Sequence, residues 1–416
     1  MHYQKISNED LKELVLGMGA VDVGIIPLTS LPNDQQENAK HIMPSVKSII
    51  SIAVDYNQSA IKSKFQPIGN MAFKNGYKQR DKVCYGVEKE LLKHTNNVVC
   101  VTDTFAMDYE LETPWLLSHK DIAEKAGIGV MGLNRIVLHP LHGVGITLGA
   151  ILIDQDFDKY DQPLKDDPCI NCNLCKAVCP TGCINKDDFN FMSCYTHNYR
   201  NRGNSFGDLV TRLEHKNTKL DPITYDEKNK LWASIQEGYG FSCNRCIAVC
   251  PASQKELAQF KTDKKKYYQT YVKPFLDKEE VVFMTEGSNV EAYIDKNPNK
   301  TKKIVSNGMT MDSILAFKNG LRIVFNKSDA MGLNRTFQFE FTGKEKQVFT
   351  VRILDGAFEV VHKQVEGADL IIKADSQMWL KAMKEKKYFL IGMVSGKIKL
   401  KGNPKNMSLF SKIFRS

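Results

Sequence analysis

Cysteine spacing is the feature that most constrains this chain of 416 residues. Eleven cysteines are present, and residues 168–180 read PCINCNLCKAVCP, a Cys-x2-Cys-x2-Cys-x3-Cys-Pro run. A second run, CNRCIAVCP at residues 243–251, ends in the same way but lacks the first cysteine. Two such dense runs in a chain without other disulfide-like spacing indicate metal ligands rather than disulfides.

The first run has the spacing that binds [4Fe–4S] clusters in bacterial proteins, where the fourth cysteine ligates a second cluster. Three thiolates on a tight loop can bind three corners of one cubane, and the fourth thiolate, on the following turn, faces away. The second run then needs one more thiolate, which Cys194 in FMSCYTH can supply. The predicted ligands are Cys169, Cys172, Cys175 and Cys250 for the first cluster, and Cys179, Cys194, Cys243 and Cys246 for the second.

Zinc is the alternative metal, because Cys-x2-Cys pairs also bind zinc in tetrahedral sites. The first run offers more thiolates than one tetrahedral ion can use, so the spacing favours iron–sulfur clusters, which carry single electrons. Of the remaining cysteines, Cys84 and Cys100 are expected to be buried and inert. Cys183 follows Cys179 by four residues and competes with it as a ligand, although Cys179 matches the spacing better.

Residues 123–135, AEKAGIGVMGLNR, contain a literal Gly-x-Gly-x-x-Gly at Gly127, Gly129 and Gly132. A dinucleotide-binding fingerprint requires a strand before the glycines and a helix after them. Here the preceding SHKDIAEKAG reads as a helix with Ser118 as its N-cap, and a β-rich run follows. We therefore reject a dinucleotide site and interpret these glycines, together with Gly143, as places where the backbone approaches a large flat ligand.

Composition and charge exclude few classes of protein. The net charge of +9, from 57 basic and 48 acidic residues, is compatible with a nucleic-acid partner without requiring one. The densest basic run, residues 261–275, is interpreted as a solvated helix or, alternatively, as an RNA-contacting surface. No apolar run reaches 18 residues, and Ser7-x-x-Asp10 near the start predicts a capped helix rather than a targeting segment. We therefore expect a cytoplasmic protein without a membrane span.

From about residue 280 the cysteines end and the pattern changes. FQFEFTG (337–343) alternates apolar and polar residues, and Asp355-Gly356 predicts a hairpin turn inside 348–361. A strand leading into a helix follows in 367–386, and another strand and helix in 396–410. A meander of antiparallel strands followed by helices predicts an α+β layer.

The stretch AEKAGIGVMGLNRIVLHPLHGVGITLGAILID, followed by the double cysteine motif, resembles the epoxyqueuosine reductase family, which is related to the reductive dehalogenases. Residues 11–28 and 45–56 also resemble it, so that the resemblance covers residues 1 to about 260. It implies a cobalamin held base-off between an α/β domain and a ferredoxin-like module. It also implies an external electron donor of the ferredoxin or flavodoxin type, whose electrons pass through both clusters to cobalt.

The family's proposed proton donor is an aspartate at the end of a strand. Asp103 follows an apolar strand here but stands further from the glycines than in the family, and Glu112 stands at nearly the family distance with Glu in place of Asp. Either carboxyl can act as a general acid if burial raises its pKa, or can be a solvated loop carboxylate. Tyr109 resembles the tyrosine proton donor of dehalogenases.

ADLIIKADSQMWLKAM and SGKIKLKGNPKNM resemble the sterol carrier protein domain, in which a sheet and helices enclose a tunnel for apolar ligands. Five apolar side chains either line such a tunnel or fill an ordinary core. They are Phe337, Phe339, Phe341, Trp379 and Met383.

We therefore predict an α/β cobalamin-binding-type domain (1–157), a ferredoxin-like double-cluster module (158–278) and an α+β sterol-carrier-like domain (279–416). The predicted function is that of a cobalamin-dependent iron–sulfur reductase acting on a small or apolar substrate. The last domain binds or shields that substrate or, alternatively, forms a homodimer or has a purely structural role. One alternative is an epoxyqueuosine reductase acting on tRNA. Another is a non-catalytic protein that transfers electrons or handles a corrinoid.

Overall fold

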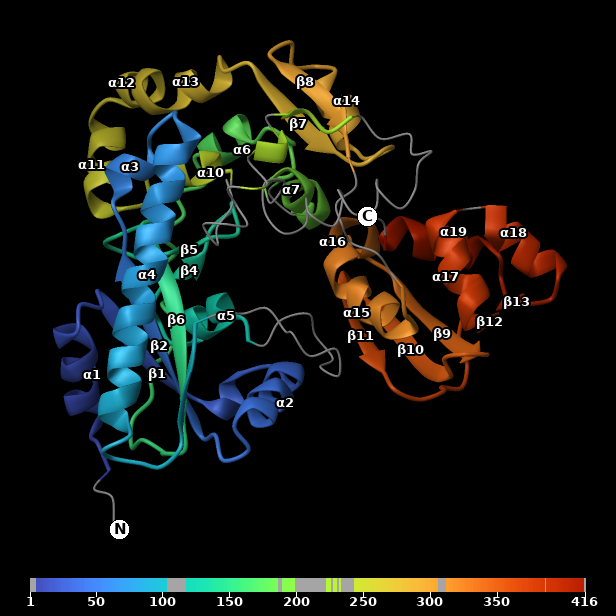
Figure 1. Cartoon of the computed structure of the whole chain (residues 1–416), viewed down its shortest axis with the longest axis horizontal. Helices are drawn as coiled ribbons and strands as arrows, with labels where there is room; N and C mark the ends of the chain where they lie inside the picture. The colour runs from blue at the N-terminus through green and yellow to red at the C-terminus, as the bar shows by residue number, and fades with distance from the viewer. Residues whose placement is uncertain are drawn as a thin grey trace. The chain divides into compact units, whose positions relative to one another are not determined.

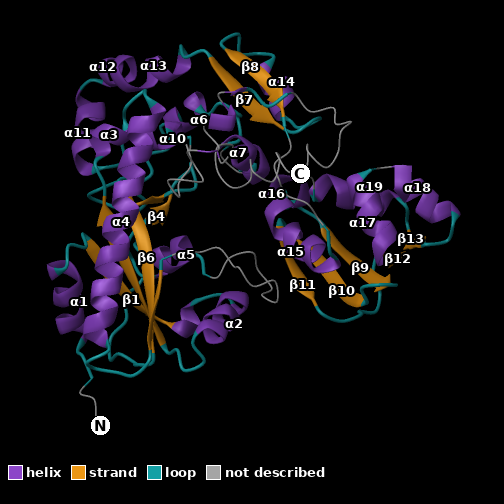
Figure 2. Ribbon diagram, viewed as in Figure 1, coloured by secondary structure: helices purple, strands orange, loops and turns teal. Residues whose placement is uncertain are grey.

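The computed structural model describes residues 5–102, 117–185, 189–198, 222–225, 227–229, 232, 243–305, 312–385 and 387–414. The chain divides into two compact units, both of which mix helices and strands (Figure 2). The first unit comprises Met1–Asn185 and Ser193–Gly308, and the second comprises Lys186–Met192 and Met309–Ser416. None of the described helices combines the length and the apolar character that a membrane span requires.

A four-stranded sheet forms the centre of the first unit. Its order is β1 (Asp22–Pro27), β2 (Ser48–Asp55), β6 (Ile146–Ile153), β3 (Val98–Val101), and every neighbouring pair is antiparallel. The central strands read SIISIAVD and ITLGAILI and are buried along nearly their whole length. Such continuous apolar runs are expected of strands that are covered on both faces.

Helices cover both faces of this sheet. On one face lie α1 (Asn8–Gly17) and α4 (Gln66–Leu91), and on the other lie α2 (Asn33–Ile42) and α5 (His119–Lys125) (Figure 1). The predicted N-caps are confirmed, because the hydroxyl oxygens of Ser7 and Ser118 accept the N–H groups of Asp10 at 3.0 Å and Asp121 at 3.3 Å. Cys84 is buried between α4 and the sheet, with Cys100 packed against the same core.

Short elements make up the rest of the first unit. They are η1 (Leu28–Ser30), α3 (Gln58–Ile61), β4 (Val130–Met131), β5 (Val137–Leu138), α6 (Leu174–Val178), α10 (Arg245–Ala248), α11 (Gln254–Thr262), α12 (Lys264–Tyr267), η2 (Tyr268–Val272), α13 (Lys273–Leu276), β7 (Glu280–Met284), α14 (Val290–Ile294), β8 (Lys300–Ile304) and α7 (Phe191–Asn198), whose first two residues fall in the second unit. The parallel pair β7–β8 places residues 280–304 in this unit, although the sequence grouped them with the last domain. The order around the glycines, α5 and then the β4–β5 hairpin and β6, is the predicted one.

The second unit is a five-stranded sheet packed with helices. The sheet order is β11 (Ala357–Val361), β10 (Gln347–Leu354), β9 (Asn334–Thr342), β12 (Leu370–Asp375), β13 (Ile398–Gly402). The helices are α15 (Ile314–Val324), α16 (Lys327–Ala330), α17 (Ser376–Lys384), α18 (Lys387–Val394) and α19 (Lys405–Ile413).

The hairpin predicted at Asp355-Gly356 is confirmed, and both residues have a positive φ, of 44° and 76°. The prediction of an antiparallel meander is wrong for β12, which pairs with β9 in parallel. The reason is that the chain leaves β11 at one edge, crosses the sheet and enters on the other side of β9.

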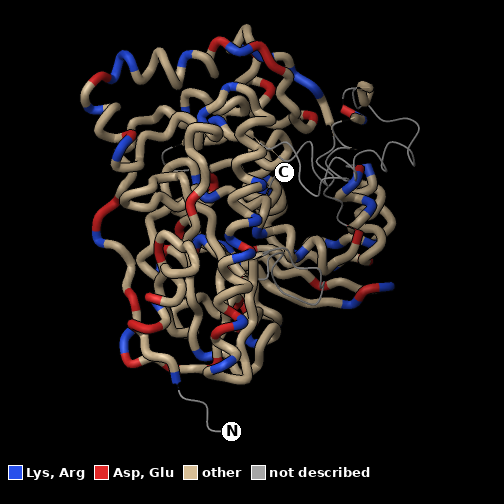
Figure 3. Tube along the Cα trace, turned by 60° about the vertical axis from the view of Figure 1, so that its left-hand side comes forward, with Lys and Arg blue, Asp and Glu red and all other residues tan. Residues whose placement is uncertain are grey.

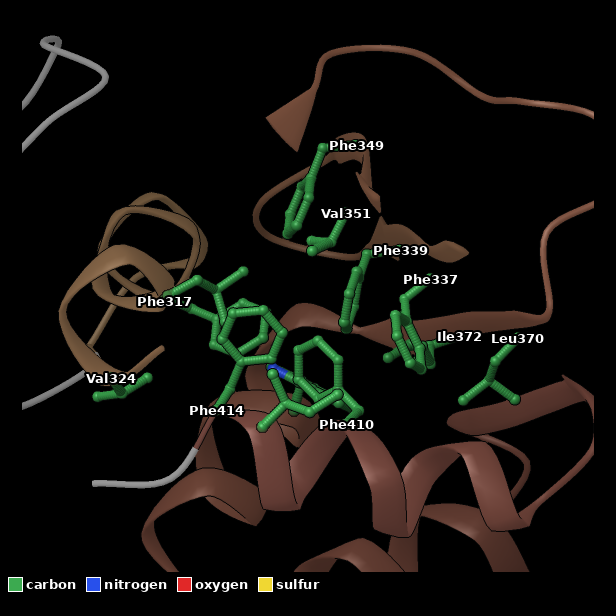
Figure 4. Close-up of a cluster of buried hydrophobic side chains, with 14 of the residues drawn as sticks. Phe317, Val324, Phe337, Phe339, Phe349, Val351, Leu370, Ile372, Phe410 and Phe414 are labelled. Atoms are coloured by element: carbon green, nitrogen blue, oxygen red, sulfur yellow. The ribbon is translucent and has the colours of Figure 1, made fainter. Parts of the chain in front are cut away.

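An aromatic core lies between this sheet and its helices. The rings of Phe339 and Phe349 stack with centroids 5.0 Å apart, and Phe317 meets Trp379 edge to face at 5.4 Å. Figure 4 shows these phenylalanine rings converging with Phe410. Four of the five side chains considered for a tunnel, Phe337, Phe339, Phe341 and Trp379, therefore fill a core, whereas Met383 is 45% exposed.

Candidate metal centre

The two cysteine runs meet because α6 and α10 pack against each other. Val178 at the end of α6 joins Ala248 and Val249 of the second run in a small core, which Val272 and Phe275 complete. Both helices are about one turn long, so the cysteines inside them and just beyond their ends lie close to this contact. The packing of two short helices thereby places residues far apart in sequence beside one another.

All four predicted ligands of the first cluster line one partly open cavity. Cys169, Cys172 and Cys175 come from the first run and Cys250 from the second. Leu133, Asn134 and Leu138, from the glycine-rich stretch, form another part of the wall. We name this cavity with its four thiols the first thiol site. Its donor set, four cysteines around one space, fits a [4Fe–4S] cluster.

Left-handed backbone turns wrap the loop around this cavity. Asn171 and Asn173 have φ values of 51° and 62°, a region that asparagine tolerates better than most residues. The side-chain amide of Asn173 donates to the carbonyl of Asn171 at 3.0 Å, and a carboxylate oxygen of Asp167 accepts the N–H of Cys169 at 2.8 Å. These bonds hold successive cysteines toward the same space.

A second group of thiols contains the four predicted ligands of the second cluster and one more. We name this group the second thiol site; it comprises Cys179, Cys183, Cys194, Cys243 and Cys246. The sulfur atoms of Cys179 and Cys183 are 3.4 Å apart, and Cys194 lies close enough to Cys183 to interact with it electrostatically. The spacing favours Cys179 over Cys183 as a cluster ligand, whereas the structure places both thiols together.

Burial raises the pKa values of these thiols. The pKa of Cys243 rises to about 11 and those of Cys175 and Cys250 to about 12, chiefly because the charged thiolate would lose its hydration. The thiols therefore keep their protons at neutral pH until a metal replaces them, so that metal loading releases protons. Among the described side chains, no three His, Cys, Asp or Glu groups are arranged to hold a single metal ion.

A buried ion pair lies behind each site. Lys62 pairs with Glu256 and also donates to the hydroxyl of Tyr267 at 3.1 Å, and it is close enough to Cys250 to interact electrostatically. Behind the second site, Arg245 pairs with Glu280, whose other oxygen accepts from Lys300 at 2.6 Å. Arg245 lies near Cys243, where its positive charge favours the thiolate.

The basic run 261–275 buries three of its apolar side chains. Tyr267, Val272 and Phe275 are buried, and the exposed positions carry the lysines at 261 and 264–266. Elsewhere in the described part of the chain, Lys and Arg positions are distributed along the trace (Figure 3). Tyr267 and Phe275 thus have a packing role, whereas the lysines and Tyr268, which is 39% exposed, remain available to a polyanion.

The four glycines considered for a ligand face protein in this structure. A Cβ atom at Gly127 or Gly129 would stand 2.5 Å from the backbone oxygen of Gln162 or Leu138, respectively. At Gly132 it would stand 2.8 Å from the Leu138 side chain, and at Gly143 it would collide with the backbone of Ser253. The close packing explains why glycine is present at each of these positions. The glycines by themselves therefore do not support a corrinoid site.

The candidate proton donors Asp103, Tyr109 and Glu112 lie outside the described residues.

Comparison with known proteins gives relatives for both parts of the chain. Residues 325–415 match the SCP-2 sterol transfer family. The chain is 26% identical over 216 residues to the epoxyqueuosine reductase of Staphylococcus aureus, which covers 51% of this chain and 50% of the relative. With the epoxyqueuosine reductase of Atelocyanobacterium thalassa it shares 24% identity over 268 residues, or 62% of this chain and 75% of the relative.

Solved structures include two similar proteins. The epoxyqueuosine reductase of Bacillus subtilis matches with a TM-score of 0.37 and 18% identity over 60% of this chain and 65% of its own. A catabolic reductive dehalogenase matches with a TM-score of 0.38 and 14% identity over 63% of this chain and 35% of its own. The chain spans about half the length of the first of its curated relatives. The two curated sequence relatives and the family match confirm both resemblances inferred from the sequence. The chain is similar to the epoxyqueuosine reductases, and its residues 325–415 match the SCP-2 sterol transfer family.

Proposed function

We propose that this protein is an iron–sulfur oxidoreductase that holds two [4Fe–4S] clusters and passes electrons through them to a corrinoid, which reduces a small or apolar substrate. One observation carries the proposal: three cysteines of the first run and Cys250 of the second line a single cavity. Neither run alone offers this donor set. The similarity to epoxyqueuosine reductases supports an oxidoreductase, and the corrinoid rests on that family resemblance alone.

The residues of the chain have separate tasks in this proposal. The thiolates of the two sites bind iron, and the clusters supply one-electron transfer when they are bound. Asn134, in the wall of the first site, donates to the carbonyl of Cys246 at 3.4 Å and so ties that wall to the second site. Buried Lys62 and Arg245 would offset part of the negative charge of the Cys250 and Cys243 thiolates, respectively.

The substrate and its protonation are proposed from the resemblance. Asp103 or Glu112, or Tyr109 in their place, would donate the proton, and Gly127, Gly129, Gly132 and Gly143 would border the corrinoid. The SCP-2-like segment would bind or shield the substrate. Its described aromatic core is filled by its own side chains, so an apolar ligand would have to displace them or bind at the surface.

Reduction of epoxyqueuosine in tRNA is the second candidate, and the names of the curated relatives favour it. The exposed lysines at 264–266 are the observation that fits a polyanion. If tRNA binds there, its affinity will fall steeply with salt, and replacing the three lysines by glutamine will lower that salt slope by about three. An affinity that does not respond to salt contradicts this candidate.

An anaerobic titration of the iron-loaded protein with cobalamin, followed by ultraviolet–visible absorption, tests the main proposal. We expect a base-off spectrum and cobalt that a low-potential donor reduces through the protein. A Cys172→Ala variant, which lacks a ligand of the first site, should bind cobalamin but reduce it more slowly. A cobalamin spectrum that the protein leaves unchanged, with both clusters still reducible, overturns the corrinoid and leaves an electron-transfer protein.

A further inference from the structure

We propose that Cys183 is an alternative ligand of the second cluster and exchanges with Cys179 at one iron. The inference rests on the proposed clusters and deepens the second site, which has five thiols for four positions. The predicted ligand set uses Cys179 and leaves Cys183 without a role. The structure, however, places the two sulfur atoms 3.4 Å apart, within contact distance.

The short separation fits two thiols that would bind the same iron of a cluster in turn. Ligands of different irons in a cubane diverge from its centre, so their sulfur atoms stand farther apart than the irons do. Two sulfurs in van der Waals contact therefore cannot serve two different irons without moving apart. Each of them can serve one iron alone, so Cys179 and Cys183 are alternatives at a single position.

The local backbone explains why the two thiols meet. Gly182 has a φ of 63°, which turns the chain back after Pro180-Thr181, and its N–H donates to the carbonyl of Cys179 at 3.4 Å. The hydroxyl of Tyr293 donates to the same carbonyl at 3.0 Å, and its ring fills the space beside Gly182. The turn that brings Cys183 toward Cys179 is thus fixed by packing.

The exchange balances without an oxidant or reductant. Cys183 gives up its thiol proton and binds the iron, while Cys179 leaves the iron and takes up a proton. One iron–sulfur bond forms and another breaks, and no electron is transferred. The hydroxyl of Thr181, 3.5 Å from the sulfur of Cys179, provides a hydrogen-bond partner for that sulfur on the protein side.

The test compares single and double alanine variants, with iron and sulfide content and the electron paramagnetic resonance (EPR) signals of the reduced clusters as readouts. Wild-type protein reconstituted anaerobically should bind about eight iron atoms, four in each cluster. We expect Cys179→Ala and Cys183→Ala each to keep about eight and to show slightly different signals from the second cluster. The double variant should keep about four. Cys172→Ala is the matched control, because the first site has no spare thiol, and it should also keep about four.

Other outcomes overturn the inference in distinguishable ways. If Cys179→Ala alone falls to about four iron atoms while Cys183→Ala keeps about eight, Cys183 is not a ligand. If the double variant keeps about eight, the corner is filled by some other group. If the wild-type protein itself binds no iron–sulfur cluster, the proposed function fails first. Urea unfolding of the metal-free proteins separates a lost ligand from a lost fold.

Discussion

The two thiol sites come from the same pair of cysteine runs, yet their surroundings differ. The first site opens into a cavity with exposed residues such as Ile170 at its rim and has four thiols. The second has five thiols and packs beside the buried ion pairs of Glu280. Spacing therefore limits which cysteines are available to a cluster. The surrounding fold determines how exposed each thiol is and whether another thiol lies close enough to replace it.

Loss of one thiol should have the largest effect, and it should be confined to one site. We expect Cys250→Ala to halve the iron content, because the first site has no substitute for that ligand, and to leave the EPR signal of the second cluster in place. Cys243→Ala should do the reverse. If either variant loses both clusters while its metal-free protein still folds, the two sites form as one unit. That result would contradict the claim that each site depends on its own thiols.

The buried carboxylate behind the second site should matter more to stability than a surface one. Glu280→Gln leaves Arg245 and Lys300 buried without their shared negative partner, which typically costs about 3–5 kcal/mol. Glu291→Gln is the control, since Glu291 pairs with Lys302 at 2.9 Å on the surface and should cost less than about 1 kcal/mol. Urea unfolding of the metal-free proteins measures both. Equal effects would contradict the distinction between a buried and a surface network.

His197 should make the stability of the second site's surroundings sensitive to acid. Burial lowers its pKa to about 4, and its Nδ1 accepts the N–H of Phe283 at 3.3 Å, which requires a neutral ring. The unfolded state, with a pKa near 6.5, binds more protons between pH 6.5 and 4. The free energy of unfolding is therefore unaffected by protonation of His197 above about pH 6.5. It decreases as the pH falls toward 4, by up to about 3 kcal/mol, because the unfolded state gains the proton first.

The measurement is the free energy of unfolding of the metal-free protein at several values of pH, compared with that of His197→Phe. The variant should show a shallower loss of stability between pH 6.5 and 4.5. A pH profile identical to that of the wild-type protein would show that other groups account for its acid sensitivity.

Much of the fold could be predicted because local patterns determine it. The alternation of β9, the cap at Ser7 and the Asp355-Gly356 turn depend on neighbouring residues and were read correctly from them. The parallel pairing of β12 with β9 could not be read in this way, since it depends on where the chain crosses the sheet. Likewise, spacing grouped the four cysteines that line the first cavity but could not foresee the turn at Gly182 that brings Cys183 onto Cys179.

For the glycines, the residue type predicted that another group approaches the backbone closely, but it did not predict which group this is. Sequence indicated close backbone approach at Gly129 and Gly143, and the structure has it. The approaching group is the protein's own backbone, at Leu138 and Ser253, and a one-dimensional pattern cannot tell a peptide from a ligand.

The smallest expected effect belongs to Ser253, which lies between Gly143 and the first site. Its hydroxyl oxygen accepts the N–H of Glu256 at 3.2 Å and caps α11, while its backbone packs on Gly143. Ser253→Ala should cost about 1 kcal/mol of stability, because it removes the cap but keeps the backbone contact, and Ser253→Asp should restore most of it. Iron content should stay unchanged in both. A loss of iron from the first cluster in Ser253→Ala would mean that the cap, through Glu256 and Lys62, also positions Cys250, and the first site would then depend on its surroundings as closely as the second does.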